Sequence, residues 1–231
     1  MIFKTPLVRG FFIKRYKRFF ADIRLEDGRV VVAHVPNTGS MLSCLEDNIP
    51  CALSFDPNPK RKLSYTLEMT FNGVTWIGLN TLKTNYLVEE ALQNAVISEC
   101  QGYSKILREQ TIGDSRLDFL LSQHPSRKDL YLEVKNVTLK ENNVALFPDA
   151  VSTRGHKHLK ELMNIKKSSC DSALLFVIQR EDTALFSPAQ KIDPFYTELF
   201  YSAQAMGVLI LAYSCQVSPQ EIKIYQSIPI N

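Results

Sequence analysis

Runs of alternating apolar and polar residues predict a strand-rich first part of the chain. The segment 19–25 alternates over its second half, and the valine-rich segment 30–35 follows it. Between them, Asp27 and Gly28 form a dipeptide that favours the positive φ of a tight hairpin turn. Further short β-prone runs, with no convincing helix, lie at 52–55, 63–69 and 74–79. Residues 1–80 are therefore predicted to form a small β-barrel, of which the OB type is one candidate.

Residues 81–231 alternate between helical and strand patterns. Apolar positions spaced by 3.6 residues predict a helix over 86–98, with Asn85 as its N-cap, and another from Thr153 to about 167. Asp193 before Pro194 predicts a third helix, which ends at Gly207. Strands are expected at 103–111, 116–121, 130–134, 172–178 and 208–213. The predicted order is α-β-β-β-α-β-α-β, with 172–178 apolar throughout, as in a strand buried on both faces.

Two carboxylates and one lysine interrupt apolar strands in this second part. Glu133 and Lys135 are two residues apart, so their side chains point to the same face of the sheet. If strands 116–121 and 130–134 form a hairpin, Asp118 lies opposite Glu133. Carboxylates are ligands for Mg²⁺, a bound metal activates water, and a lysine stabilises a developing oxyanion. The pattern predicts a phosphodiester-hydrolysing site; the alternative is an ordinary set of cross-strand ion pairs.

Three groups of basic residues are candidates for nucleic-acid contacts, because cations neutralise phosphates and aromatic rings stack on bases. The first group combines charge with aromatic residues, the second follows a turn, and the third shares one helix face near an N-terminus with Glu161. Solvated surface charges are the alternative in each case. The three groups are Lys14, Arg15, Tyr16, Lys17 and Arg18; Lys60, Arg61 and Lys62; and Arg154, Lys157 and His158.

Charge and cysteine content narrow the classes of protein. The net charge of the chain is +3, but residues 1–80 carry +4 and residues 81–231 carry −1, which modestly favours a nucleic-acid partner for the first part. The five cysteines are scattered without a Cys-x-x-Cys pair, so reduced thiols are expected rather than zinc ligands or disulfides. No apolar run has the length of a signal-peptide core or membrane span. A cytoplasmic protein without a membrane partner is expected.

The order of elements from the first helix to strand 172–178 resembles the core of the PD-(D/E)XK nuclease fold, with Asp118, Glu133 and Lys135 at the expected strand positions. That fold often takes a further carboxylate from the preceding helix, which carries Glu89 and Glu90. Glu90 is therefore the first candidate for a third metal ligand. Glu109, in strand 103–111, is its rival. Asp149 is either a residue of the outer shell or a turn residue.

Seven ordered blocks resemble the sugar fermentation stimulation protein A (SfsA) family over nearly the whole chain. The blocks lie at 13–19, 36–41, 60–62, 115–119, 133–139, 147–151 and 153–159. The resemblance implies an N-terminal OB-like barrel, a C-terminal nuclease-like domain and non-specific DNA binding. It also implies a regulatory link to sugar (maltose) metabolism, and it leaves open whether members cleave nucleic acid.

Together, these patterns predict an α+β protein with an OB-like, nucleic-acid-binding barrel at residues 1–80 and a PD-(D/E)XK nuclease-like α/β domain at residues 81–231. The expected function is backbone-directed DNA binding with an Mg²⁺-dependent or Mn²⁺-dependent hydrolytic site. Asp118, Glu133 and Lys135 are the expected catalytic residues, and Asp118, Glu133 and Glu90 the expected metal ligands. The alternative is a non-catalytic DNA-binding regulator that keeps the nuclease scaffold.

Overall fold

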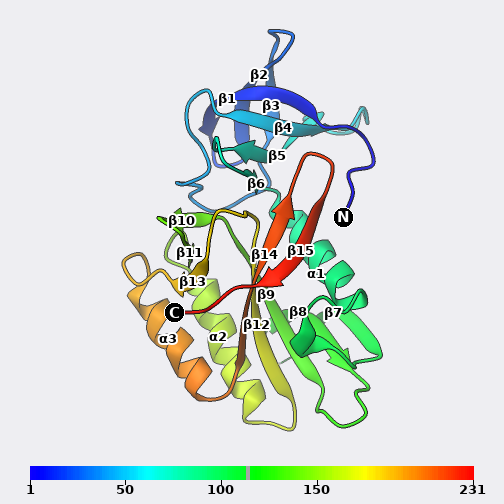
Figure 1. Cartoon of the computed structure of the whole chain (residues 1–231), viewed down its shortest axis with the longest axis vertical. Coiled ribbons are helices and arrows are strands. Elements are labelled where there is room, and N and C mark those ends of the chain that lie inside the picture. Colours follow the sequence, from blue (N-terminus) through cyan, green and yellow to red (C-terminus); the bar gives the residue numbers. More distant parts are fainter. Residues whose placement is uncertain (113–114) are drawn as a thin grey trace.

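The computed structural model describes residues 1–112 and 115–231. It shows a barrel stacked on a larger α/β unit along the long axis of the molecule (Figure 1). None of the helices in the described part of the chain has the length and hydrophobicity needed to cross a membrane.

Six strands form the first unit. Five of them follow the order β3-β2-β1-β4-β5, and a parallel pairing of β3 with β5 closes them into a barrel. The sixth strand, β6, pairs with the C-terminal end of β5. The β-barrel expected from the sequence is therefore confirmed. Gly28, with φ of +87°, forms the predicted turn between β2 and β3. The strands are β1 (Val8–Tyr16), β2 (Phe20–Leu25), β3 (Val30–His34), β4 (Pro50–Phe55), β5 (Tyr65–Phe71) and β6 (Trp76–Gly78).

A six-stranded mixed sheet of order β15-β14-β12-β9-β8-β7 organises the second unit. The central strand β12 runs parallel to both β9 and β14. Residues 173–178 of β12 are fully buried, which confirms the strand expected from the continuous apolar run. The strands are β7 (Lys105–Ile112), β8 (Ser115–Ser122), β9 (Leu130–Val137), β12 (Asp171–Ile178), β14 (Leu209–Val217) and β15 (Ile222–Ser227).

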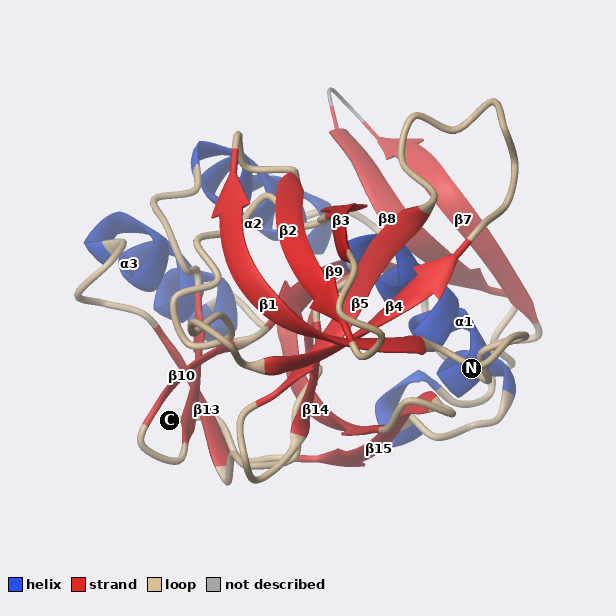
Figure 2. Ribbon diagram, turned by 90° about the horizontal axis from the view of Figure 1, so that it is seen from above, coloured by secondary structure: helices blue, strands red, loops and turns tan. Residues whose placement is uncertain are grey.

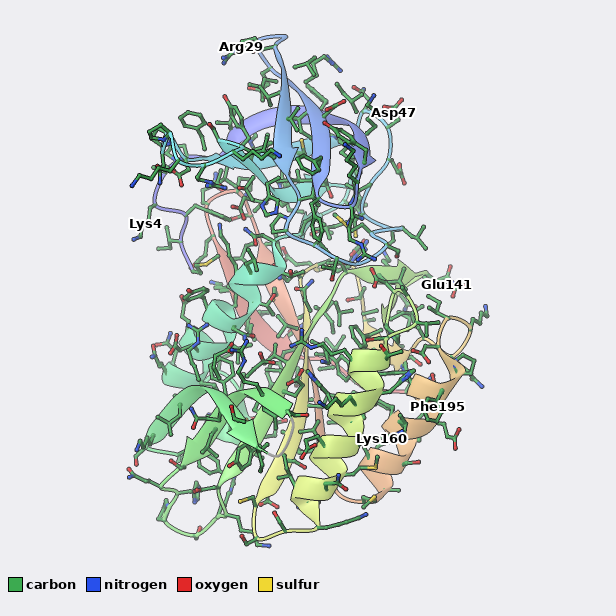
Figure 3. All side chains as sticks on the ribbon, turned by 180° about the vertical axis from the view of Figure 1, so that it is seen from behind. Lys4, Arg29, Asp47, Glu141, Lys160 and Phe195 are labelled. Atoms are coloured by element: carbon green, nitrogen blue, oxygen red, sulfur yellow. The ribbon has the colours of Figure 1, made fainter. Side chains whose placement is uncertain are left out.

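Helices cover both faces of this sheet, because successive side chains of β12 point to opposite sides. Leu175 and Val177 pack in one apolar core with helix α1 (Thr84–Gln93), whereas Leu174 and Phe176 pack in another with α2 (Thr153–Lys166) and α3 (Pro194–Ala205) (Figure 2). Helices α2 and α3 lie side by side, with the Lys160 ammonium 5.2 Å from the centre of the Phe195 ring (Figure 3).

The ends of the helices differ partly from the prediction. Asn80, rather than Asn85, accepts the capping hydrogen bond, from the Leu82 N–H of a short 3₁₀ helix that leads into α1. Asn85 lies inside α1, where its amide bonds to Asp118 instead, so a tertiary contact decides its place. Helix α1 ends at Gln93 and not near residue 98.

The third helix begins and ends as predicted. The Asp193 carboxylate caps α3 by accepting the Tyr196 N–H at 2.9 Å, and Gly207 follows the helix with φ of +84°. The same carboxylate accepts the Ser152 N–H at 2.9 Å and pairs with His156, so it also holds the start of α2. Burial acts to raise the pKa of Asp193, but these donors outweigh it, and the pKa lies below its ordinary value.

A small additional sheet of order β10-β11-β13 was not expected from the sequence. Its strands are only three or four residues long, and β11 pairs in parallel with a segment about 40 residues further along the chain. No local pattern therefore predicts this sheet. The strands are β10 (Leu139–Glu141), β11 (Val144–Phe147) and β13 (Leu185–Pro188).

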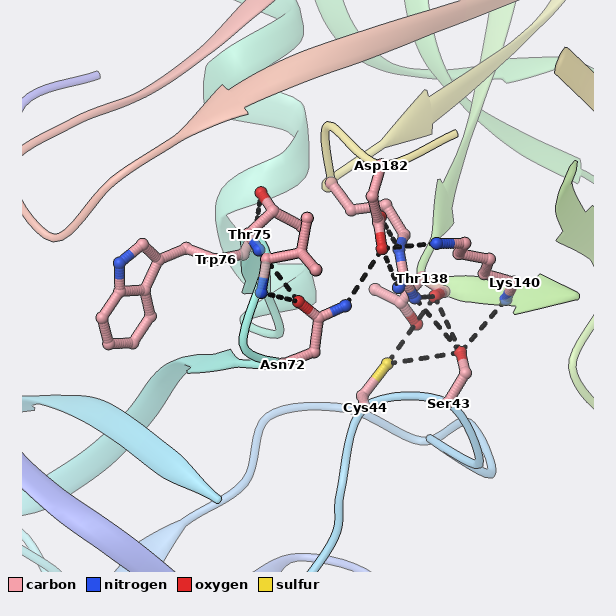
Figure 4. A network of polar contacts seen from close by, with 10 residues as sticks. Ser43, Cys44, Asn72, Thr75, Trp76, Thr138, Lys140 and Asp182 are labelled. Atoms are coloured by element: carbon pink, nitrogen blue, oxygen red, sulfur yellow. Dashed lines mark hydrogen bonds and ion pairs between the residues drawn. The ribbon is translucent and has the colours of Figure 1, made fainter. Parts of the chain in front are cut away.

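A buried polar network ties the barrel to the α/β unit (Figure 4). Arg180 is only 2% exposed and donates to both carboxylate oxygens of Asp182 and to the Thr138 carbonyl. From the barrel, Asn72 donates to Asp182 at 3.0 Å and the Ser43 hydroxyl donates to the Thr138 carbonyl at 3.2 Å. Burial acts to raise the pKa of Asp182, but its Arg180 and Lys140 donors hold the pKa far below its usual range.

Replacing Arg180 by alanine is expected to lower the free energy of unfolding by about 3–5 kcal/mol, because it leaves a buried carboxylate short of a partner. Urea denaturation followed by circular dichroism measures the change. Lys191→Ala is the control, since Lys191 is 88% exposed and its 3.6 Å contact with Glu141 lies at the surface. A loss under 1 kcal/mol for Arg180→Ala would contradict the role of this network.

Asp193→Ala is expected to cost about 1–2 kcal/mol at pH 7, because Asp193 caps α3. Since the folded pKa of Asp193 is lowered, its contribution is present above the unfolded pKa of about 3.9 and is lost as the pH falls through the folded value. The difference between variant and unmodified protein should therefore narrow below about pH 4. Denaturation curves at pH 7, 5 and 3 test this, with the exposed residue Asp47 replaced by alanine as the control.

Candidate active site

A cleft of about 830 Å³ lies between the barrel and the α/β unit. The barrel contributes its loop 37–39 and Arg18 to the walls, and the α/β unit contributes Asp118, Glu133 and Lys135. All three residues expected to be catalytic therefore line one cavity.

Asp118 and Glu133 face each other where two strands separate. The pairing of β8 with β9 runs from Leu121–Leu130 to Phe119–Leu132, so the next step places Asp118 opposite Glu133, as predicted. At that step the Asp118 carboxylate, rather than a β8 carbonyl, accepts the Val134 N–H at 2.8 Å. Its other oxygen accepts the Asn85 amide at 2.8 Å. Asp118 is thus held by neutral donors from a strand and a helix.

Glu133 is 2% exposed, and its two carboxylate oxygens have different surroundings. Oε1 accepts hydrogen bonds from Lys135 Nζ, at 2.6 Å, and from His158 Nδ1. Oε2 is buried and has no hydrogen-bond partner among the described residues. A buried carboxylate oxygen without a donor is costly, so Oε2 is the position where a ligand with positive charge would be stabilised.

Their environments push the pKa values of the two carboxyl groups apart. Burial raises the pKa of Asp118, and the negative charge of Glu133 raises it further, more than the Asn85 and Val134 donors lower it. Burial also acts to raise the pKa of Glu133, but the His158 hydrogen bond and the Lys135 charge outweigh it, so this pKa is lowered. Glu133 is therefore the better stabilised anion, and Asp118 is the one that gains most from a nearby cation.

The donor set fits a hard divalent cation. It offers two facing carboxylates, one with an unpartnered oxygen, beside an open cleft. In the described ranges 1–112 and 115–231, no three His, Cys, Asp or Glu side chains gather in a metal-binding arrangement. Mg²⁺ commonly binds through one or two carboxylates and keeps several waters, so Asp118 and Glu133 would suffice as protein ligands for such a cation.

The structure does not bring Glu90 to this pair. Its carboxylate accepts a hydrogen bond at 2.7 Å from the amino group of Met1, which also donates to the Ile222 carbonyl of β15. Glu109 does line the cleft, and the register of β7 with β8 places it opposite Asp118. Its side chain, however, pairs with Arg116 at 2.7 Å. Of the two candidates, Glu109 therefore lines the cleft, whereas Glu90 is paired with the amino group of Met1.

Two residues of the first basic group, Lys17 and Arg18, form the exposed tip between β1 and β2. Arg18 lines both the cleft and an adjoining groove of about 440 Å³. Arg15 instead donates to the carbonyls of Asn37 and Gly39, at 2.7 and 2.8 Å, and so holds the loop that forms the cleft wall.

The remaining members of this group lie on β1. Tyr16 lines the adjoining groove and stacks on Phe20, with ring centres 5.8 Å apart. Lys14 is exposed and contacts Asp22 at 3.6 Å.

The second basic group lies at the same end of the barrel. Arg61 donates to Asp56 and Thr66, both at 3.0 Å, while Lys60 and Lys62 are exposed. Thr66 pairs with His34, and His34 pairs with Phe20, beside the tip of the β1–β2 hairpin. One of the three charges in this group, that of Arg61, thus holds its own turn, and the two lysines face solvent.

The third group divides between the surface and the interior. Arg154 is exposed and lines the cleft, and Lys157 is exposed on the next turn of α2. His158 is only 5% exposed and contacts Glu133 and Lys135. It therefore lies beneath the cleft rather than on the surface that was expected to clamp phosphate.

Sequence reasoning missed two contributors to the site. The sequence predicts Asn85 as a helix cap, yet its amide orients Asp118. The Tyr196 hydroxyl of α3 is buried without a partner among the described residues, and burial, together with the charge of Glu133, raises its pKa. Its position in an apolar helix gives no signal of this.

Asp149, for which the sequence leaves two roles open, links the barrel to the cleft rim. Its carboxylate accepts hydrogen bonds from the Ser40 hydroxyl at 3.3 Å and from the Met41 N–H at 3.4 Å.

Comparison with known families finds a matching family model for each of the two units. The family model described as "Sugar fermentation stimulation protein RE domain" matches residues 82–221, and "SfsA N-terminal OB domain" matches residues 13–79. The second match confirms the expected OB type of barrel.

Similar proteins extend over the whole chain. A sugar fermentation stimulation protein homolog of Geobacter sulfurreducens is 45% identical, covering 100% of this chain and 98% of the relative. That of Desulfotalea psychrophila is 46% identical, over 94% and 92%. The structure of Pyrococcus furiosus SfsA in complex with Ca²⁺ has a TM-score of 0.90 at 25% identity and covers 100% and 98% of the two chains. The chain belongs to the sugar fermentation stimulation protein (SfsA) family.

Proposed function

We propose that the chain is a metal-dependent hydrolase of phosphodiester bonds, and that it binds DNA non-specifically through contacts with the DNA backbone. The observation that carries the proposal is the unpartnered, buried oxygen of Glu133, a residue that lines the same cleft as Asp118 and Lys135. A buried acid with a free oxygen is costly to the fold, so it points to a ligand that compensates for it.

Four residues that line the cleft have roles in the proposed reaction. Asp118 and Glu133 would hold Mg²⁺ or Mn²⁺. The metal supplies a bound water of lowered pKa and neutralises charge on the phosphate. Lys135 places its ammonium beside Glu133, where it stabilises negative charge that develops on a phosphate oxygen. Asn85 fixes the orientation of Asp118. The Ca²⁺ in the structure of Pyrococcus furiosus SfsA supports a site for a hard cation in this family.

DNA is the proposed partner because exposed cations surround the cleft. Arg18 and Arg154 line it from opposite domains, and Lys17 lines the adjoining groove. Lys60 and Lys62 extend the charge at the same end of the barrel. Such contacts neutralise phosphates without reading bases. A link to sugar (maltose) metabolism, expected from the family resemblance, would then act through DNA, with or without cleavage.

Glu133→Gln is expected to lower the rate of DNA cleavage in Mg²⁺ or Mn²⁺ at least about 100-fold, because it removes a charged metal ligand. Plasmid, single-stranded DNA and RNA, each with metal or with EDTA, are the substrates of the assay. Glu198→Gln is the matched control, since Glu198 is exposed on α3.

Metal-dependent cleavage that disappears in Glu133→Gln, while DNA binding in EDTA persists, supports the enzyme. If the unmodified protein binds DNA but cleaves none of the three substrates with either metal, the hydrolase is excluded and the non-catalytic regulator takes its place.

The double variant Lys17→Gln with Arg18→Gln is expected to bind DNA more weakly and with a salt dependence flatter by roughly 2 in log–log slope, because two phosphate contacts are lost. Fluorescence anisotropy in EDTA at several salt concentrations measures both quantities. Lys191→Gln with Lys223→Gln is the control for net charge, since both lysines are solvent-accessible, with exposures of 88% and 47%. Equal slopes for the two variants would place the DNA elsewhere.

A further inference from the structure

A chain of three side chains connects the surface of the cleft to the buried carboxylate of Glu133. Arg154 and His158 are four residues apart on α2 and therefore lie on one side of the helix. Arg154 Nε is 3.4 Å from His158 Nε2, and His158 Nδ1 contacts Glu133 Oε1. Arg154 is exposed in the cleft, whereas His158 and Glu133 are buried.

One tautomer of His158 satisfies both ends of this chain. A carboxylate only accepts hydrogen bonds, so Nδ1 must carry the hydrogen that is shared with Glu133. The other ring nitrogen of a neutral imidazole is then an acceptor. Arg154 Nε is only a donor, which matches it. Lys135 Nζ also lies 3.0 Å from Nδ1, but its hydrogen bond goes to the same Glu133 oxygen, at 2.6 Å.

The two donors therefore fill one oxygen of Glu133 and leave the other free. Lys135 comes from the same strand as Glu133, whereas His158 comes from α2, so together they fix the carboxylate from two elements. Groups that hydrogen-bond to a ligating carboxylate orient it and tune its affinity for metal.

We propose that His158 is a positioning residue that fixes Glu133 for a divalent cation and couples that cation to a DNA phosphate bound by Arg154. The proposal rests on the proposed function, since it assigns a phosphate subsite and a second role within the same cleft. A phosphate at the Arg154 guanidinium restrains its Nε–H toward His158, and so restrains Glu133. By linkage, DNA then tightens cation binding, and the cation tightens DNA binding by the same factor.

Two substitutions of His158 separate its two contacts. In His158→Asn, the side-chain amide N–H takes the place of Nδ1–H beside Glu133, but nothing replaces Nε2 beside Arg154. His158→Leu removes both contacts and leaves an apolar side chain of similar size. Lys160→Gln, on the exposed side of the same helix, is the control. Circular dichroism and thermal melts confirm that each variant folds.

Calorimetric titration with Ca²⁺, with and without a DNA oligonucleotide, measures the coupling without any need for cleavage. In the unmodified protein, the oligonucleotide should tighten Ca²⁺ binding several-fold. His158→Leu should weaken Ca²⁺ binding about 10- to 100-fold even without DNA. His158→Asn should bind Ca²⁺ alone within a few-fold of the unmodified protein but lose most of the tightening by DNA. Arg154→Gln should lose the same tightening.

The outcomes distinguish this proposal from the proposed function. If the unmodified protein binds Ca²⁺ and cleaves DNA while folded His158→Leu binds Ca²⁺ equally well, the positioning role is overturned and the hydrolase stands. Equal tightening by DNA in His158→Asn and the unmodified protein overturns the coupling to Arg154. If the unmodified protein binds no divalent cation, both proposals fall together.

Discussion

The hydrogen bond from the Val134 N–H to the Asp118 carboxylate is the contact on which the candidate site depends. Backbone donors inside a fold need a partner, and here a side chain supplies it in place of the neighbouring strand. β8 and β9 therefore part after Phe119 and Leu132, while β9 continues to Val137 against β12 alone. Residues 133–137 border the opening. One carboxylate thus both ends the strand pairing and is fixed at the edge of the cleft that results.

The two carboxylates at this opening are stabilised unequally. Glu133 accepts hydrogen bonds from a lysine and a histidine, and its pKa is lowered. Asp118 accepts hydrogen bonds from neutral amide groups, and its pKa is raised. A buried and a half-buried acid on paired strands oppose folding, and the sheet retains them in the lining of one cleft. This is the arrangement expected of a site that favours binding over stability. The free oxygen of Glu133 is where the remaining cost is concentrated.

Period-two alternation predicted that Asp118, Glu133 and Lys135 share one face, and the structure places all three in the lining of one cleft. Strand geometry leaves little freedom once the register is known. Contacts between segments that lie far apart in the sequence could not be predicted from this alternation. Asn85 has the same local preference for a helix cap as Asn80, and only the position of Asp118, 33 residues away, decides between them. His158 has neighbours typical of an exposed helix face, yet the packing of α2 on the sheet turns it inward.

The charge of the barrel shows why the net charge of a domain does not reveal which of its cations are available to a partner. Its net charge of +4 counts Arg15 and Arg61, whose guanidinium groups are already engaged by carbonyls of the cleft loop and by Asp56. Lys17 and Arg18 remain at an exposed tip that would carry no chemistry on an isolated barrel. The Arg180 network and the contacts of Asp149 with the barrel loop fix that tip beside the carboxylates. The interface between the domains therefore brings exposed cations of the barrel beside the carboxylates of the α/β unit. The proposed function needs both, because the cations would attract a phosphate and the carboxylates would hold the metal.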